Sequence, residues 1–269
     1  MDSNETITPV EETPNENGEL SHSDKMIGVF TEPAKMFDYT SKFPTRNKDW
    51  VIPVIIFFIV VALIRMIAMT NEEVYFEAKR KGIERIEKMV ESGMMTREQA
   101  DQAIEGIDKQ MEFMKGPVGW VITIATTLIF GFIVFFIIVG IYYLFIRFLL
   151  KGEGTFASAL VANGLTIYIS ILQVIIGGIL TMLLGKMIMD TSLASIMGTD
   201  KNTIIGWLLG KVDPISIWAY IVLSIGLAKM YKSESTGKYY ALVFGLWLIG
   251  MFILFQLAQA VPFLQNFMQ

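Results

Sequence analysis

Long apolar blocks alternate with charged segments along most of the chain. A membrane helix needs about 20 apolar residues, because each residue advances about 1.5 Å along a helix that must cross roughly 30 Å of hydrocarbon. We therefore predict an all-α, polytopic membrane protein, a bundle of five transmembrane helices. The predicted spans are residues 50–70, 118–147, 158–184, 213–230 and 239–263.

The charged segment 71–117 separates the first two spans. Apolar residues recur in each half of it at spacings of three and four, which is typical of helices that pack along one seam. Gly93 suits the position just after a helix end, and Thr96 with Gln99 has the spacing of a capping box. We predict an extramembrane helical hairpin that either packs on itself or serves as a stalk for a partner.

Residues 1–24 are acidic and polar, with few groups that could be buried. Such a composition predicts a disordered tail, with an acidic docking tail as the alternative. The only histidine of the chain, His22, lies in this segment, so we expect no histidine-based site.

Segment 25–49 is predicted to be interfacial and amphipathic. Its apolar residues Val29 and Phe37 are spaced to share one face of a short helix over Gly28–Tyr39, and Pro33 suits a first helical turn. Segment 187–212 is predicted to be a loop that contains an interfacial or re-entrant helix, because its apolar part is too short to span.

The composition agrees with a membrane protein and excludes several chemistries. Hydrophobic residues make up 53% of the chain and charged residues 18%, below the usual share of about a quarter in soluble domains. The formal net charge of −4 argues against a nucleic-acid surface. Cysteine is absent from the sequence, which excludes disulfides and thiolate catalysis. We expect no cofactor, no metal site and no catalytic residues.

Five residues are candidates for a functional role within or beside the spans: Arg65, Asn163, Gln173, Asp213 and Trp218. Arg65 either extends its side chain to the headgroups or has a function in the membrane. Asn163 and Gln173 either bridge packed helices or bind a substrate. Asp213, followed by a proline, either caps a helix or is a working carboxylate, and Trp218 is an interfacial anchor.

Basic residues favour one orientation. Lysines and arginines flank the start of span 1 and the connections between spans 2 and 3 and between spans 4 and 5. Because cytoplasmic loops are enriched in basic residues, we predict a multi-pass protein of the cell (inner) membrane with a cytoplasmic N-terminus and an external C-terminus. The basic residues of segment 71–117 count against this orientation.

Several stretches together resemble the Yip domain family of five-span membrane proteins that interact with Ypt/Rab GTPases, and its bacterial branch in particular. They are "GVFTEPAKMF", "KDWVIPVII", "GEGTFASAL" and "VDPISIWAYIVLSIGLAKMYKSESTGKYYAL". The resemblance implies a helical membrane domain with a cytosolic N-terminus and no established catalytic activity; eukaryotic members assist vesicle trafficking and membrane shaping. The "DLYGP"-type stretch linked to the eukaryotic role is missing here, so the resemblance implies the fold and the location rather than a GTPase partner.

Three classes of function follow from these observations. A non-enzymatic scaffold or adaptor in membrane organisation would work through membrane lipids and through a membrane-protein partner or a homo-oligomer. A small transporter or channel would need polar groups along one path at mid-membrane. An intramembrane enzyme is the least favoured, since only carboxylates remain for catalysis. A water-accessible cavity between spans would favour transport, and a solid core with small residues at the helix contacts would favour the scaffold.

Overall fold

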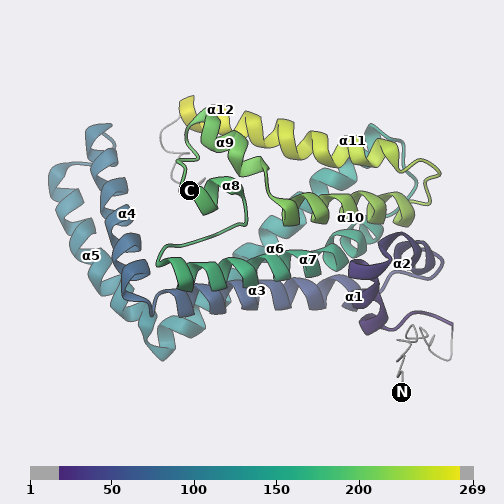
Figure 1. The fold of residues 1–269 in the computed structure, drawn as a ribbon, viewed down its shortest axis with the longest axis horizontal. Helices are drawn as coiled ribbons and strands as arrows, with labels where there is room; N and C mark the ends of the chain where they lie inside the picture. Colours follow the sequence, from purple (N-terminus) through teal and green to yellow (C-terminus); the bar gives the residue numbers. More distant parts are fainter. Residues whose placement is uncertain (1–17, 261–269) are drawn as a thin grey trace, which may run out of the picture.

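The computed structural model describes residues 18–260, and every regular element in that range is helical. Figure 1 shows α3, α6 and α7 side by side, with α10, α11 and α12 along one side and the α4–α5 hairpin projecting from one end. The helices are α1 (His22–Thr31), α2 (Pro33–Thr40), α3 (Lys48–Ala68), α4 (Glu72–Glu91), α5 (Arg97–Lys115), α6 (Pro117–Phe148), α7 (Phe156–Leu184), α8 (Leu193–Met197), α9 (Ile204–Lys211), α10 (Pro214–Met230), α11 (Gly237–Gly245), the π-helical turn η1 (Leu246–Gly250) and α12 (Met251–Ala260).

The helices confirm the predicted polytopic bundle. Four of them are long and apolar enough to cross a membrane, the last being the continuous Gly237–Gln259 segment of α11, η1 and α12. A fifth crossing is possible through α9 and α10, which are bent by 58° at a short break. Residues 261–263 of the predicted fifth span lie outside the described range.

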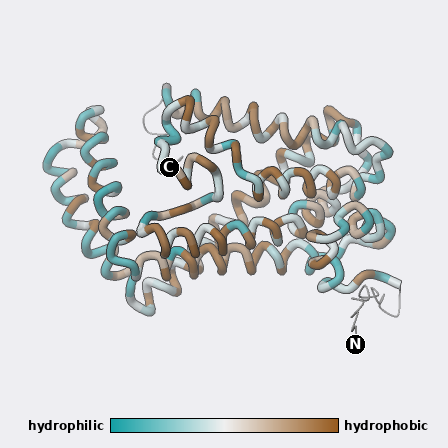
Figure 2. The backbone as a smooth tube through the Cα atoms, viewed as in Figure 1, coloured by the Kyte–Doolittle hydropathy of each residue, from teal (hydrophilic) through white to brown (hydrophobic). Residues whose placement is uncertain are grey.

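The surface of α6 shows which solvent the bundle requires. Val121, Phe130 and Phe148 are 68%, 67% and 77% exposed, and Figure 2 shows apolar colour along the bundle helices in contrast to the more hydrophilic α4–α5 hairpin. A soluble protein rarely exposes so large a contiguous apolar surface. Acyl chains solvate such a surface, while the helices satisfy their own backbone hydrogen bonds.

Helices α3 and α7 form the closest pair of the bundle. A Cβ atom added at Gly164 would lie 2.4 Å from the Cα of Trp50, and one added at Gly178 would lie 2.6 Å from the side chain of Ile64. The residue numbers differ by 114 in both pairs, so the two helices run parallel and in register. Small residues permit this approach in lipid, where packing rather than water exclusion holds helices together.

Helix α7 also faces α10, and a glycine of α10 receives the N-terminal helices. Phe37 of α2 is fully buried, and a Cβ atom added at Gly226 would lie 2.8 Å from its ring. Val29 of α1 is fully buried as well. The apolar face predicted for segment 25–49 therefore packs against the bundle instead of facing lipid.

Two expectations for the N-terminal part of the chain were wrong. Residues 18–24 are ordered, because Ser21 and Asp24 form a reciprocal capping box that starts α1. Residues 1–17 of the predicted acidic tail lie outside the described range. The predicted single helix over Gly28–Tyr39 is two helices: Pro33 begins α2, as its first-turn preference predicts, but the preceding turn belongs to α1.

The α4–α5 hairpin has the predicted caps. The Thr96 hydroxyl accepts from the backbone N–H of Gln99 at 3.2 Å, and the Gln99 side chain accepts from the backbone N–H of Thr96 at 2.9 Å. Gly93, with φ of 73°, follows the end of α4. An ion pair of 2.6 Å between Lys79 and Asp108 links the two helices.

The first prediction concerns the contact between α3 and α7. Gly164→Ala should lower the free energy of unfolding by about 1–3 kcal/mol, because the new methyl group meets the backbone of Trp50 and the helices must separate. Gly140→Ala is the matched control, since a Cβ atom there meets no described atom within 4 Å. Thermal unfolding of the purified protein in detergent measures both; equal melting curves for the two variants would contradict the packing.

Candidate functional site

Asp213 lies at the break between α9 and α10. Its carboxylate accepts from the backbone N–H groups of Ile215 and Ser216 at 3.2 and 3.3 Å, and Pro214 occupies the first turn of α10. Asp213 is thus the N-cap of α10, where the helix dipole favours negative charge. The helix cap predicted from the "DP" pair is confirmed.

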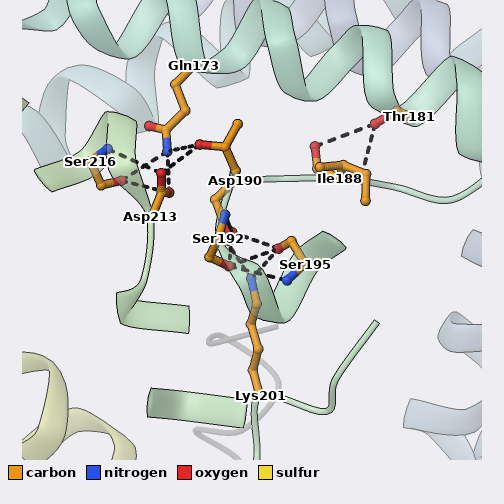
Figure 3. A network of polar contacts seen from close by, with 10 residues as sticks. Gln173, Thr181, Ile188, Asp190, Ser192, Ser195, Lys201, Asp213 and Ser216 are labelled. Carbon is orange, nitrogen blue, oxygen red and sulfur yellow. Dashed lines mark hydrogen bonds and ion pairs between the residues drawn. The ribbon is translucent and has the colours of Figure 1, made fainter. Parts of the chain in front are cut away.

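The carboxylate of Asp213 also accepts three side-chain hydrogen bonds (Figure 3). Gln173 of α7 donates at 2.6 Å, Thr191 of the following loop at 2.6 Å, and Ser216 at 3.0 Å. Gln173 in turn bonds the Ser216 hydroxyl at 3.0 Å. Three segments that are distant in sequence meet at this one buried carboxylate, and we call these four residues the Asp213 network.

The Asp213 network lies near the middle of the bundle. The register of α3 and α7 places Gln173 level with Ile59, close to the midpoint of α3. A charged group at that depth costs roughly 2.5–3.5 kcal/mol on insertion scales, unless it is compensated. Five hydrogen-bond donors surround the carboxylate, so its main chemical effect is to hold the broken span against α7.

A second polar cluster lies beside the Asp213 network (Figure 3). Asp190 accepts from Ser192 at 2.5 Å, from Ser195 at 2.7 Å and from Lys201 at 2.5 Å. Burial alone would raise the pKa of Asp190, but the hydrogen bonds from Lys201, Ser192 and Ser195 outweigh it and lower the pKa. This cluster fixes the turn of α8.

The three carboxylates of this region are engaged separately. Asp190 binds Lys201 and its serines, whereas Asp213 binds Gln173 and Thr191. Asp200 accepts from the backbone N–H of Asn202 at 2.9 Å. Within residues 18–260, histidine and acidic side chains form no group of three that could hold a metal ion.

A buried charged cluster at the start of α3 was missed by sequence reasoning. Lys25 of α1, only 1% exposed, donates to Asp49 at 2.6 Å and to Glu19 at 3.1 Å. His22 bonds Asp49 at 3.0 Å through Nδ1 and the Tyr168 hydroxyl of α7 at 2.8 Å through Nε2. The expectation that His22 lies in a disordered tail was wrong, because its helix is held down by this cluster.

Two signals in the sequence could have revealed this cluster. Ser21 followed three residues later by Asp24 has the spacing of a capping box, which marks the start of a helix. Asp49, directly before the first span, needs a partner if it is buried. Its partner Lys25 is the first basic residue of the chain.

The other predicted residues lie apart from the Asp213 network. Asn163 is buried, but it donates to the backbone carbonyl of Ala159 in its own helix at 2.9 Å. Trp218 packs edge-on against Phe30 of α1, with ring centroids 5.8 Å apart. Arg65 is exposed in the last turn of α3. Of the five candidates, the structure brings only Gln173 and Asp213 together.

The apolar helices and the internally satisfied polar groups define a polytopic helical membrane protein. Comparison with family models gives the family: residues 27–257, from α1 into α12, match the Yip1 domain, and the chain belongs to this family. The predicted resemblance to the Yip domain family is confirmed, while the bacterial branch stays a prediction. No curated protein and no solved structure matches the chain.

The second prediction separates the roles of Asp213. Asp213→Ala should lower the free energy of unfolding by at least about 2 kcal/mol, because it removes a helix cap and leaves buried donors without an acceptor. Asp213→Asn should stay close to the wild type, since its carbonyl can still cap α10 and the amide of Gln173 can turn to accept. Chemical unfolding in detergent micelles measures both variants; equal losses in the two would show that the negative charge itself is required.

Proposed function

We propose that this Yip1-domain protein is a non-enzymatic scaffold or adaptor that organises other proteins or lipids in the membrane. The observation that supports it best is the close packing of the spans at glycines. A Cβ atom at Gly131 would lie 2.5 Å from the Phe58 ring, in addition to the contacts at Gly164 and Gly178. A core of this kind is a rigid support and leaves little room for a substrate path between α3, α6 and α7.

The positions of two clefts in the described part of the chain agree with this proposal. The larger cleft, of about 790 Å³, is lined by loop residues such as Lys151 and Ser233 at one end of the bundle. A smaller one lies between α4 and the loop that contains Asp200. Both clefts lie outside the contacts between the spans.

The α4–α5 hairpin is the surface that we propose for a partner. It projects from the bundle (Figure 1), and its exposed face combines charged residues with the large apolar side chains of Phe76 and Phe113, which are 62% and 51% exposed. Exposed aromatic residues surrounded by charge are common features of protein interfaces. A membrane protein, including a second copy of this chain, fits such a surface.

The orientation is part of the same proposal. Lys42, Arg147, Lys229 and Lys232 belong to the elements at the end of the bundle opposite the hairpin, where α2 meets α10. We propose that this end is cytoplasmic, that the hairpin lies outside, and that the protein resides in the inner membrane of the cell.

The third prediction tests the adaptor role by site-specific photo-crosslinking in native membranes. A crosslinking residue at position 76 should give a discrete adduct with a second membrane protein or with a second copy of the chain. The same residue in place of Lys109 is the control, because Lys109 is exposed on the hairpin and pairs with Glu105 of its own helix. Identical products from both positions, or none from position 76, would contradict a specific docking face.

Transport is the second candidate, and two features of the helices favour it. Span 4 is broken between α9 and α10 beside the Asp213 network, and span 5 contains the π-helical turn η1. Broken helices with polar groups at mid-membrane form the substrate sites of many transporters. The Tyr220 and Trp247 rings, 4.8 Å apart, join the two irregular spans.

The fourth prediction separates the two candidates by thiol accessibility, for which the cysteine-free chain is a clean background. Ser216→Cys should resist a membrane-impermeant thiol reagent from both sides in the scaffold, because Ser216 lies in the Asp213 network. Labelling of this variant would indicate a water path and favour transport. Lys232→Cys should react only from the cytoplasmic side and Met94→Cys only from outside; the reverse pattern would overturn the proposed orientation.

A further inference from the structure

An open cleft of about 790 Å³ lies at the end of the bundle opposite the hairpin. Three connections form it: residues 41–45 after α2, residues 151–155 between α6 and α7, and residues 231–235 between α10 and α11. We propose that this cleft binds a phosphate monoester, supplied either by an anionic lipid headgroup or by a soluble phosphate compound. We refer to it below as the loop cleft.

The loop cleft contains positive charge that the protein does not neutralise. Lys151, Lys232 and Lys238 line it together with Glu153 and Glu234. Within residues 18–260, none of these five side chains forms an ion pair. The lysines therefore exceed the acids, and their ammonium groups are available for a charge-assisted hydrogen bond to an anion.

The backbone at two of these lysines is unusual. Lys151 and Lys232 have φ values of 54° and 52° and are the only residues other than glycine with positive φ in the described range. Both follow the end of a helix, α6 and α10, where glycine would adopt this conformation without cost. A lysine at either position is conformationally strained, and residues with strained backbone are concentrated at binding sites.

The loops of the cleft are held in place before any ligand binds. Arg147 donates to the carbonyl of Gly152 at 3.2 Å, and the Tyr231 hydroxyl donates to the carbonyl of Thr155 at 3.2 Å. A Cβ atom added at Gly154 would lie 2.5 Å from the Tyr231 ring, so the loop fits closely against this side chain. A preorganised loop lowers the entropy that binding costs.

Two helices begin at the loop cleft. The N-terminus of α7 lies at Thr155 and Ser158, and α11 begins at Gly237 without a side-chain cap, next to Lys238. Unpaired N–H groups and the helix dipole make a helix N-terminus favourable for phosphate. The N–H groups and the helix dipoles therefore favour a bound anion, as the lysines do.

The lining of the cleft includes a buried hydroxyl that lacks a well-formed hydrogen bond. Tyr239 is fully buried and lines the cleft, and Ser233 of the same lining lies close to its hydroxyl without the geometry of a full hydrogen bond. A buried hydroxyl that lacks a well-formed hydrogen bond destabilises the folded protein. A phosphate oxygen that reaches the floor would accept from it.

The level of the loop cleft along the bundle matches the headgroup region. Phe145 and Phe148 in the last turn of α6 and the C-cap residue Leu149 are 43%, 77% and 66% exposed, as lipid-facing residues are. Lys151 follows two residues after Leu149, so the cleft begins where the apolar surface ends. A lipid phosphate and a soluble one can therefore both reach it.

The test uses the full-length protein in nanodiscs and two probes. Phosphatidic acid in a phosphatidylcholine bilayer tests the lipid source, and glycerol 3-phosphate added to pure phosphatidylcholine nanodiscs tests the soluble source. Lys151→Asn with Lys232→Asn removes both charges and keeps residues that tolerate the left-handed backbone. This double variant should bind at least one probe about tenfold more weakly, because two charge-assisted contacts are lost.

The controls separate binding from folding. Lys109→Gln removes an exposed charge on the hairpin and should leave both affinities unchanged. Lys238→Gln lies within a helix and replaces the double variant as the test if the double variant has a lowered melting temperature. Lys238→Gln should weaken binding severalfold. Tyr239→Phe should also weaken binding severalfold; unchanged affinity together with a higher melting temperature would show that the hydroxyl meets no ligand.

Each outcome decides the proposal. Weakened binding of phosphatidic acid alone supports the site and identifies a lipid; weakened binding of glycerol 3-phosphate alone, or of both probes, supports the site for a soluble phosphate as well. Wild-type protein that binds neither probe overturns the proposal, as does equal binding by the wild type and a folded lysine variant.

Discussion

The absence of water around the spans is the constraint on which the rest of the structure depends. Polar groups inside a bilayer have to be satisfied by other groups of the chain. The Asp213 carboxylate, level with the middle of α3, accepts five hydrogen bonds from three segments. The charged cluster at Lys25 and Asp49 follows a related rule at the end of the bundle, where burial within the protein requires opposite charges from α1 and α3 to pair. Both clusters join helices that apolar contacts alone would position less specifically.

Much of the fold follows from the sequence because the membrane acts on long runs of residues. Long runs of apolar residues predict the spans. Short spacings between neighbouring residues predict the hairpin caps at Gly93 and Thr96. The helix start at Asp213 is equally local. These features depend on residues close to one another in the chain, so a single sequence is enough to predict them.

The parts that could not be predicted depend on long-range partners. Nothing near Gln173 in the sequence indicates that it meets Asp213, which lies 40 residues away. His22 bonds Tyr168, which lies 146 residues away, and an acidic composition concealed the helix that carries it. The short helix predicted within segment 187–212 includes α9, but its pairing with α10 across a bend of 58° could not be predicted, because a bend angle does not depend on local spacings. Of the candidate residues, Gln173 and Asp213 were identified individually, but their contact was not.

The parallel register of α3 and α7 has a consequence for how the protein is assembled. Its first span enters the membrane long before its principal neighbour is synthesised, since the hairpin and α6 lie between them in the chain. During that interval, α3 is surrounded by lipid. The glycine-lined surface of α7 against which it later packs has not yet been synthesised. Biogenesis therefore begins with a solitary, strongly apolar helix, and α10 with its buried Asp213 cap is synthesised only after α7, which supplies Gln173 to that carboxylate.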